Sequence, residues 1–269
     1  MIHHLRAAGV DFILDARGPA APVVVHWGRA LGDLDAAALT ALADAAAPAV
    51  APSSIDRPFR VGVVPLLTEG WTGRPPVEIS PCSPVLRHLG TRRDGDAVVV
   101  TLALGDAGLE LRYALTPQGV LLVDRRVRND GAADLEVRAL SALLPVPPRA
   151  REVLDFTGRW AGEREPQRSR PGHGVWARDT RHGRGGHDDP FLFAVGTPEF
   201  GFRHGEVWAT HVAWSGDRSV WFERGDMGLS VIGAGERLDG HTLAAGDTYE
   251  APTVVAVWSD VGLDGLSAR

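Results

Sequence analysis

Residues 97–144 read AVVVTLALGDAGLELRYALTPQGVLLVDRRVRNDGAADLEVRALSALL, and this stretch decides the fold. Runs rich in Val and Leu alternate with short clusters of Gly, Pro and Asp, a pattern typical of strands joined by tight turns. The strands expected here are 97–104, 109–115, 120–128 and 135–144. Because the turns after Leu104, Leu115 and Arg128 are short, we expect antiparallel neighbours that form a meander.

The same alternation continues on both sides of this stretch. The further strands expected are 10–14, 23–27, 191–195, 200–202, 207–215, 219–223, 229–232 and 249–258. One helix is expected over 35–45, where Leu and Ala recur at helical spacing, with Asp33 or Asp35 as its N-cap and Pro48 beyond its end. This pattern favours an all-β sandwich over a βαβ fold.

Between the two groups of strands lies a Gly-, Arg- and His-rich segment, residues 155–190. It shows no clear periodicity, and it is too long for an ordinary loop in a compact domain. We expect it to be functional or packed against another part of the molecule. The last residues, 259–269, resemble the start of a helix, so we expect a sandwich domain over 1–258 followed by a linker or helix.

Composition excludes several classes of function. The formal net charge is -6 at pH 7, which leaves no electrostatic reason to expect a nucleic-acid partner. Charged residues, Gly or Pro interrupt every apolar run before the roughly 20 residues that a spanning helix needs, so we expect no membrane partner. A single cysteine, Cys82, excludes an internal disulfide. We see no secretory leader and expect a cytoplasmic location.

An ordered series of short motifs runs through the second half of the chain. Its members are Gly158-x-Trp160 with Glu163-Arg164, Gly174–Arg178, Arg184–Pro190, Gly205–Trp208, Ala213–Asp217, Gly235-Glu236, Leu243–Asp247, Glu250–Pro252 and Val257–Ser267. In this order the motifs resemble the N-terminal domain of glycoside hydrolase family 36. Each motif is weak by itself, but the ordered series is specific.

The resemblance implies a fold and an activity. The fold would be a β-supersandwich of the galactose mutarotase-like kind, packed against a C-terminal (β/α)8 barrel of the same protein. The barrel would hold two aspartates, about 5 Å apart, for retaining hydrolysis of terminal α-galactosides. The family's nucleophile motif contains Lys-Trp-Asp, and this chain has no lysine, so we assign it no catalytic residue. The resemblance also implies a homo-oligomer, and we expect no cofactor.

Family members place a tryptophan from a loop of this domain near the sugar. The corresponding candidate is Trp71, flanked by Glu69 and Arg74. A tryptophan on a loop bounded by Gly and Pro offers a flat apolar face to a sugar ring and an N–H to a hydroxyl. The alternative interpretation is that Trp71 packs on its own sheet.

Other conspicuous residues have structural interpretations. We expect Glu163 and Arg164 to form a partly buried ion pair beside Trp160, and His187 and Pro190 to shape a turn. The adjacent Asp188 and Asp189 could not form a carboxylate dyad, because extended neighbours point in opposite directions, and we expect them to be turn residues. The remaining tryptophans that we assign to the core or an interface are Trp208, Trp214 and Trp258.

His173, His182 and His187 invite a metal interpretation, but no second cluster has ligand spacing, so we expect no metal site. Two alternative functions stay open at this point. One is a free-standing carbohydrate-binding module. The other is a mutarotase-like epimerase, for which no acid–base pair is marked.

Overall fold

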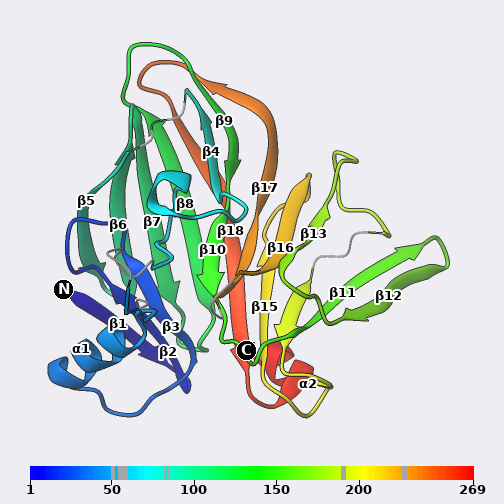
Figure 1. The fold of residues 1–269 in the computed structure, drawn as a ribbon. Helices are drawn as coiled ribbons and strands as arrows, with labels where there is room; N and C mark the ends of the chain where they lie inside the picture. The colour runs from blue at the N-terminus through cyan, green and yellow to red at the C-terminus, as the bar shows by residue number, and fades with distance from the viewer. Residues whose placement is uncertain (50–51, 54–59, 82, 84, 189–191, 226–228) are drawn as a thin grey trace.

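The computed structural model describes residues 1–49, 52–53, 60–81, 83, 85–188, 192–225 and 229–269. These residues form three antiparallel sheets and very little helix (Figure 1). The expectation of an all-β sandwich is therefore confirmed. The helices of the described residues are α1 (Ala36–Ala45), η1 (Leu67–Glu69) and α2 (Gly262–Ser267), all too short to cross a bilayer.

The largest sheet has nine strands. In spatial order they are β12 (Gly162–Ser169), β11 (Glu152–Arg159), β14 (Phe193–Gly196), β15 (Val207–Val212), β18 (Thr248–Ser259), β8 (Leu121–Asn129), β7 (Ala107–Leu115), β6 (Ala97–Leu104) and β5 (Leu86–Asp94). The expected meander is confirmed for β6, β7 and β8, which are consecutive neighbours. Two-residue turns at Gly95-Asp96 and Gly105-Asp106 explain the tight connections that flank β6.

The second sheet has six strands. Their order is β13 (Gly174–Asp179), β16 (Arg218–Arg224), β17 (Ser230–Leu243), β9 (Leu135–Leu140) and β4 (Val77–Ser80), with β10 (Ala142–Pro145) also paired to β17. A small third sheet contains β1 (Ile2–Ala7), β2 (Val10–Asp15) and β3 (Val23–Arg29).

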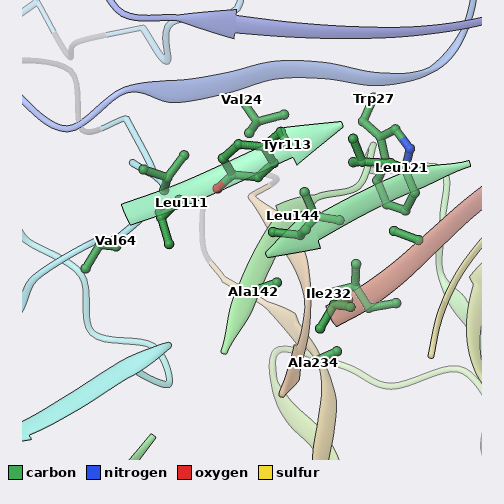
Figure 2. Packing of buried hydrophobic residues seen from close by; sticks show 14 of the residues in the cluster. Val24, Trp27, Val64, Leu111, Tyr113, Leu121, Ala142, Leu144, Ile232 and Ala234 are labelled. Carbon is green, nitrogen blue, oxygen red and sulfur yellow. The ribbon is translucent and has the colours of Figure 1, made fainter. Parts of the chain in front are cut away.

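The main core lies where side chains of all three sheets meet (Figure 2). Figure 2 shows Leu111, Tyr113 and Leu121 of the nine-stranded sheet close to Leu144 and Ile232 of the six-stranded sheet. From the small sheet, Val24 and Trp27 join the same cluster. Buried and more exposed residues alternate along most of β7 and along β8, as period-two packing requires, whereas β2 and β6 are buried along almost their whole length.

Several local expectations are confirmed. α1 begins after Asp35, whose carboxylate accepts a hydrogen bond of 2.7 Å from the Ala38 N–H and thus acts as the N-cap. The strands expected over 10–14, 23–27, 97–104, 109–115, 120–128, 219–223 and 249–258 are all present within one or two residues.

Other expectations are wrong. The strand expected over 135–144 is interrupted at Ser141, and its two parts, β9 and β10, join the six-stranded sheet rather than extend the meander. Residues 200–202 are irregular, and 207–215 is a strand only to Val212. The strand expected over 229–232 is the start of a longer one, β17.

Segment 155–190, in which the sequence shows no clear periodicity, is largely made of strands. It contains most of β11 and all of β12 and β13. β12 has an almost entirely exposed surface, so its sequence carries no alternation between apolar and polar residues that would identify a strand. The expected strand over 191–195 is β14, but residue Phe191 lies outside the described residues.

Candidate functional site

The loop that carries Trp71 leaves the core through the single turn η1. η1 ends at Gly70, which has a φ of 100°, a left-handed conformation that a glycine adopts without steric cost. Glu69 is exposed, and its carboxylate accepts a hydrogen bond of 3.3 Å from the Leu66 N–H, directed back along its own turn. Because of this turn, the chain reverses before Trp71.

Trp71 is buried within this chain. Its side chain packs against Leu143, Trp221 and Val231, and only 7% of the residue is exposed. The indole N–H donates to the Arg74 carbonyl over 3.2 Å. The structure therefore places Trp71 on its own sheet, with both its ring and its N–H engaged. The ring also borders an apolar cavity of ≈ 530 Å³, together with Leu67 and Ile79.

Glu223 of β16 holds the backbone of the Trp71 loop. Its Oε2 accepts a hydrogen bond of 2.9 Å from the Arg74 N–H. A Cβ added at Gly73 would lie 2.1 Å from Glu223 Oε1 and 2.4 Å from the Trp71 ring, so only glycine fits between them. Burial raises the pKa of Glu223 above its usual value, against the lowering effect of the Arg74 N–H and guanidinium.

The Arg74 side chain is a second attachment of the same loop. Its guanidinium lies 4.8 Å from the centre of the Trp221 ring, within the range of a cation–π contact. It also pairs with Asp179 of β13 at 3.2 Å, and Asp179 is shared with Arg237 and Ser219. Arg74 thus joins the loop to two strands of the six-stranded sheet, β13 and β16.

The structure brings together two of the three expected substrate-adjacent residues, Trp71 and Arg74, and turns Glu69 toward Leu66. Sequence reasoning missed Glu223, Asp179 and Trp221. A signal was available for two of them, because Trp221 and Glu223 stand two residues apart on a strand and therefore face the same side. Which distant loop they face is not encoded in that spacing.

The segment around Trp160 forms a protruding hairpin. Figure 1 shows β11 and β12 extending away from the rest of the chain. Trp160 lies at the tip, 80% exposed, and its ring meets that of His187 nearly edge-on at 6.0 Å. Ala161 and Arg164 both have a φ of 60°, so the tip turns through conformations that are uncommon for residues with a side chain.

The expectation of a partly buried Glu163–Arg164 pair is wrong, because both residues are exposed. Glu163 accepts a hydrogen bond of 3.1 Å from the Ala161 N–H and lies 3.7 Å from His187 Nδ1. These contacts belong to the tip of the hairpin rather than to a buried core. Pro190 lies outside the described residues.

The same region contains the acidic residues and histidines that were considered for a turn or a metal site. His182 Nε2 lies 3.2 Å from the exposed carboxylate of Asp188, while Asp189 is outside the described residues. In the part of the chain that the structure describes, no group of three or more His, Cys, Asp or Glu residues could hold a metal ion.

Trp208 and Trp258 are 1% exposed, as expected for core residues. Trp214 is different: it follows the end of β15 and is 46% exposed. The apolar residues at every second position near Trp214 predicted a strand that continues to residue 215, but β15 ends at Val212.

A second apolar cavity lies on the nine-stranded sheet, where residues of β11, β15 and β18 border it. Its volume is ≈ 310 Å³, and it is bordered by Phe156, Phe202, Val257 and Leu266, among others. Phe202 is 71% exposed, so the cavity opens onto an uncovered aromatic ring. α2 forms one wall, and its Leu263 and Leu266 pack against a small core below β14 and β15.

Comparison with known families agrees with this architecture. The model of the glycosyl hydrolase family 36 N-terminal domain matches residues 20–244. The chain belongs to this family. The family 36 domain is 33% identical over 195 residues to an alpha-galactosidase of Escherichia coli, a match that covers 70% of this chain and 27% of that protein. It is 27% identical over 183 residues to a probable alpha-galactosidase G of Emericella nidulans, covering 66% of this chain and 25% of that protein.

Solved structures show the same fold. The family 36 alpha-galactosidase AgaA of Geobacillus stearothermophilus, in complex with 1-deoxygalactonojirimycin, superposes with a TM-score of 0.85 at 22% identity, over 99% of this chain and 42% of that one. The alpha-galactosidase of Lactobacillus brevis gives a TM-score of 0.85 at 18% identity, over 99% of this chain and 40% of that one. The chain thus spans about a quarter of the length of the curated relatives that it matches.

Proposed function

We propose that this chain is the non-catalytic N-terminal domain of an α-galactosidase that hydrolyses terminal α-galactosyl residues. The observation that carries this proposal is the extent of the match: most of the chain aligns with a domain that forms about a quarter of its α-galactosidase relatives. Residues 1–258 are the sandwich domain, and 259–269 connect it to a (β/α)8 barrel. The barrel supplies both catalytic aspartates, because the Lys-Trp-Asp motif needs a lysine that this chain lacks.

The barrel docks on the apolar cavity beside α2. Exposed aromatic rings around a cavity are a common feature of surfaces that a partner covers. The cavity is bordered by α2, the segment from which the connection to the barrel runs, and it opens onto the Phe202 ring. Contact with the barrel removes the apolar surface of the Phe202 ring from water, and this burial stabilises the assembly.

The Trp71 loop, with Glu69 and Arg74, borders the substrate pocket of the assembled enzyme. Its attachment to Glu223 and Asp179 supports this role, because a loop that shapes a binding pocket must hold a defined position. Since the Trp71 ring is buried, it acts as the wall of the adjoining cavity and not as an open stacking surface. The enzyme is cytoplasmic and homo-oligomeric in this proposal.

Hydrolysis of a chromogenic α-galactoside tests the proposal. The 269-residue chain alone should be inactive, and the chain joined to the barrel of the Escherichia coli relative should be active. Phe202→Ser should lower the thermal stability of the joined protein but not of the chain alone. Leu89→Ser, at an equally apolar and 57% exposed position on β5, is the matched control and should change neither.

Activity in the chain alone would overturn the placement of the catalytic aspartates in the barrel. If neither the chain alone nor the joined protein hydrolyses the α-galactoside, a free-standing carbohydrate-binding module is favoured instead. Equal effects of Phe202→Ser and Leu89→Ser on the joined protein would refute the docking surface.

A further inference from the structure

A polar cavity on the six-stranded sheet adjoins the apolar cavity beside Trp71, with which it shares Pro75, Glu78 and Arg138. It differs from both apolar cavities in the many ionic side chains of its wall. Its volume is ≈ 390 Å³, at the lower end of the roughly 300–1,000 Å³ of small-molecule sites. It is lined by residues of β4, β9, β16 and β17 and by the end of the Trp71 loop. We call it the β17 cavity, because residues 236–240 of that strand form one side of it.

An irregularity in β17 creates the cavity. The first half of the strand pairs with β16 and β10, and the second half pairs with β9. The pairing with β9 shifts register between Arg237 and His241, so the intervening residues bulge from the ladder. Gly240, with a φ of 84°, completes the bulge, and an added Cβ there would lie 2.8 Å from Glu136 Oε1. The bulge therefore brings β17 close to the polar side chains of β9.

The ionic side chains that line the cavity balance in charge. Three are arginines, Arg74, Arg138 and Arg237, and three are carboxylates, Glu78, Glu136 and Asp239. The Glu236 side chain does not count toward this balance, because it pairs in the interior with Arg125 at 3.0 Å, where both are at most 1% exposed. A balanced wall gives no net attraction to a free anion or cation.

Four of these six ionic side chains, Arg74, Arg138, Arg237 and Glu136, are held by hydrogen bonds or ion pairs. Arg138 binds Glu136 through two hydrogen bonds of 3.0 and 2.9 Å, and Arg74 and Arg237 share Asp179. Fixed ion pairs reduce the side-chain entropy that a ligand must overcome on binding. Each carboxylate and guanidinium keeps further acceptor or donor positions beyond its ion pair. The wall thus offers fixed donors and acceptors side by side.

We propose that the β17 cavity binds a neutral saccharide, one or two sugar units long. A sugar presents neighbouring hydroxyls that both donate and accept, and it carries no charge. It therefore matches a wall in which carboxylates and guanidiniums alternate without net charge. Ala139, Leu238 and Pro75 supply apolar contacts for its C–H groups.

Titration of the ¹⁵N-labelled chain with methyl α-galactoside and with raffinose tests this site. Two indole N–H signals separate the two cavities, because Trp221 lines only the β17 cavity and Trp71 lines only the apolar one. The Trp221 N–H has no hydrogen-bond partner among the described residues, so its signal is sensitive to a change beside it. We expect a saturable shift of the Trp221 signal at millimolar sugar, with little change at Trp71.

Variants locate the binding. Glu136→Ala and Asp239→Ala remove carboxylates that line the β17 cavity and not the apolar cavity, and each should weaken binding at least about fivefold. Glu250→Ala is the matched control: its carboxylate is 75% exposed, pairs with Arg126 and lies on the other sheet, so affinity should not change.

Three results would overturn the proposal. The first is the absence of a saturable Trp221 shift with either sugar. The second is an equal shift with sodium sulfate or galacturonate, which would make the cavity an ion site. The third is a saturable shift at Trp71 alone, which would support the role of the Trp71 loop while refuting a site in the β17 cavity. Because activity of the joined protein is a separate measurement, failure here leaves the proposed function untouched.

Discussion

The carboxylate of Asp15 is 1% exposed at the end of β2 and binds Arg17 and Arg60, each at 2.9 Å. Burial by itself would raise the pKa of this carboxyl. The hydrogen bonds from Arg17 and Arg60 outweigh that effect and lower the pKa of Asp15 to about 2. Because the folded-state pKa lies below the unfolded value, ionised Asp15 stabilises the fold above about pH 4.

Asp15→Asn should therefore lower the free energy of unfolding at pH 7 by about 1–2 kcal/mol, measured by urea denaturation. This magnitude allows for solvent screening, since the side chains of Arg17 and Arg60 are 34% and 27% exposed. The difference from the wild type should shrink as the pH falls from 4 toward 2, where Asp15 becomes neutral. Asp33→Asn, at a fully exposed carboxylate that pairs with Arg6, should have no measurable effect. A deficit that does not change with pH would contradict this explanation.

At the scale of elements, β16 and the Trp71 loop form one unit. Glu223 and Arg74 are 149 positions apart, and the buried carboxylate of one binds the backbone of the other. A raised pKa means that the folded state binds the Glu223 proton more tightly than the unfolded chain does. The contribution of Glu223 to stability is therefore largest below its unfolded pKa of about 4.3 and decreases as the pH rises through the folded value.

Glu223→Gln removes this titration but keeps a carbonyl that can accept from the Arg74 N–H. We expect the melting temperature of Glu223→Gln, relative to that of the wild type, to increase steadily between pH 4 and pH 7, measured by thermal unfolding at each pH. Glu250→Gln, on an exposed carboxylate, should show no such trend. A relative melting temperature that falls with pH would show that the charged form of Glu223 is the favoured one.

At the scale of the whole molecule, two uncovered regions lie at different places. One is the cavity beside α2 with its Phe202 ring, and the other is the tip of the β11–β12 hairpin, which carries Trp160. Figure 1 shows this hairpin extending away from α2. If the barrel covers the first, the second remains available to another copy of the chain. An exposed tryptophan is a typical anchor of protein interfaces.

Trp160→Ser in the joined protein should convert the proposed homo-oligomer to smaller species, measured by size-exclusion chromatography with light scattering. Val85→Ser, at a 59% exposed position next to β5, is the matched control and should leave the mass unchanged. A wild-type monomer, or an oligomer that survives Trp160→Ser, would exclude this interface.

Some features of this protein follow from its sequence alone. Apolar runs bounded by Gly, Pro and Asp predicted β2, β6, β7 and β8, and the Asp35 cap predicted the start of α1, because these signals depend only on neighbours along the chain. The ordered motifs from Gly158 onward indicated the family, which the comparison confirms. The role of Trp71, Glu69 and Arg74 near a substrate stays a prediction.

Tertiary structure decided the rest, because it joins residues whose spacing carries no local signal. β12 is exposed along nearly its whole length, so no hydrophobic period marks it, and it is a strand through its pairing with β11. Trp71 is buried because Leu143, Trp221 and Val231 arrive from other strands. Arg125 meets Glu236 across 111 positions because their strands lie in facing sheets. Local periodicity sets which face of a strand is apolar, and only the packing of the sheets sets what that face meets.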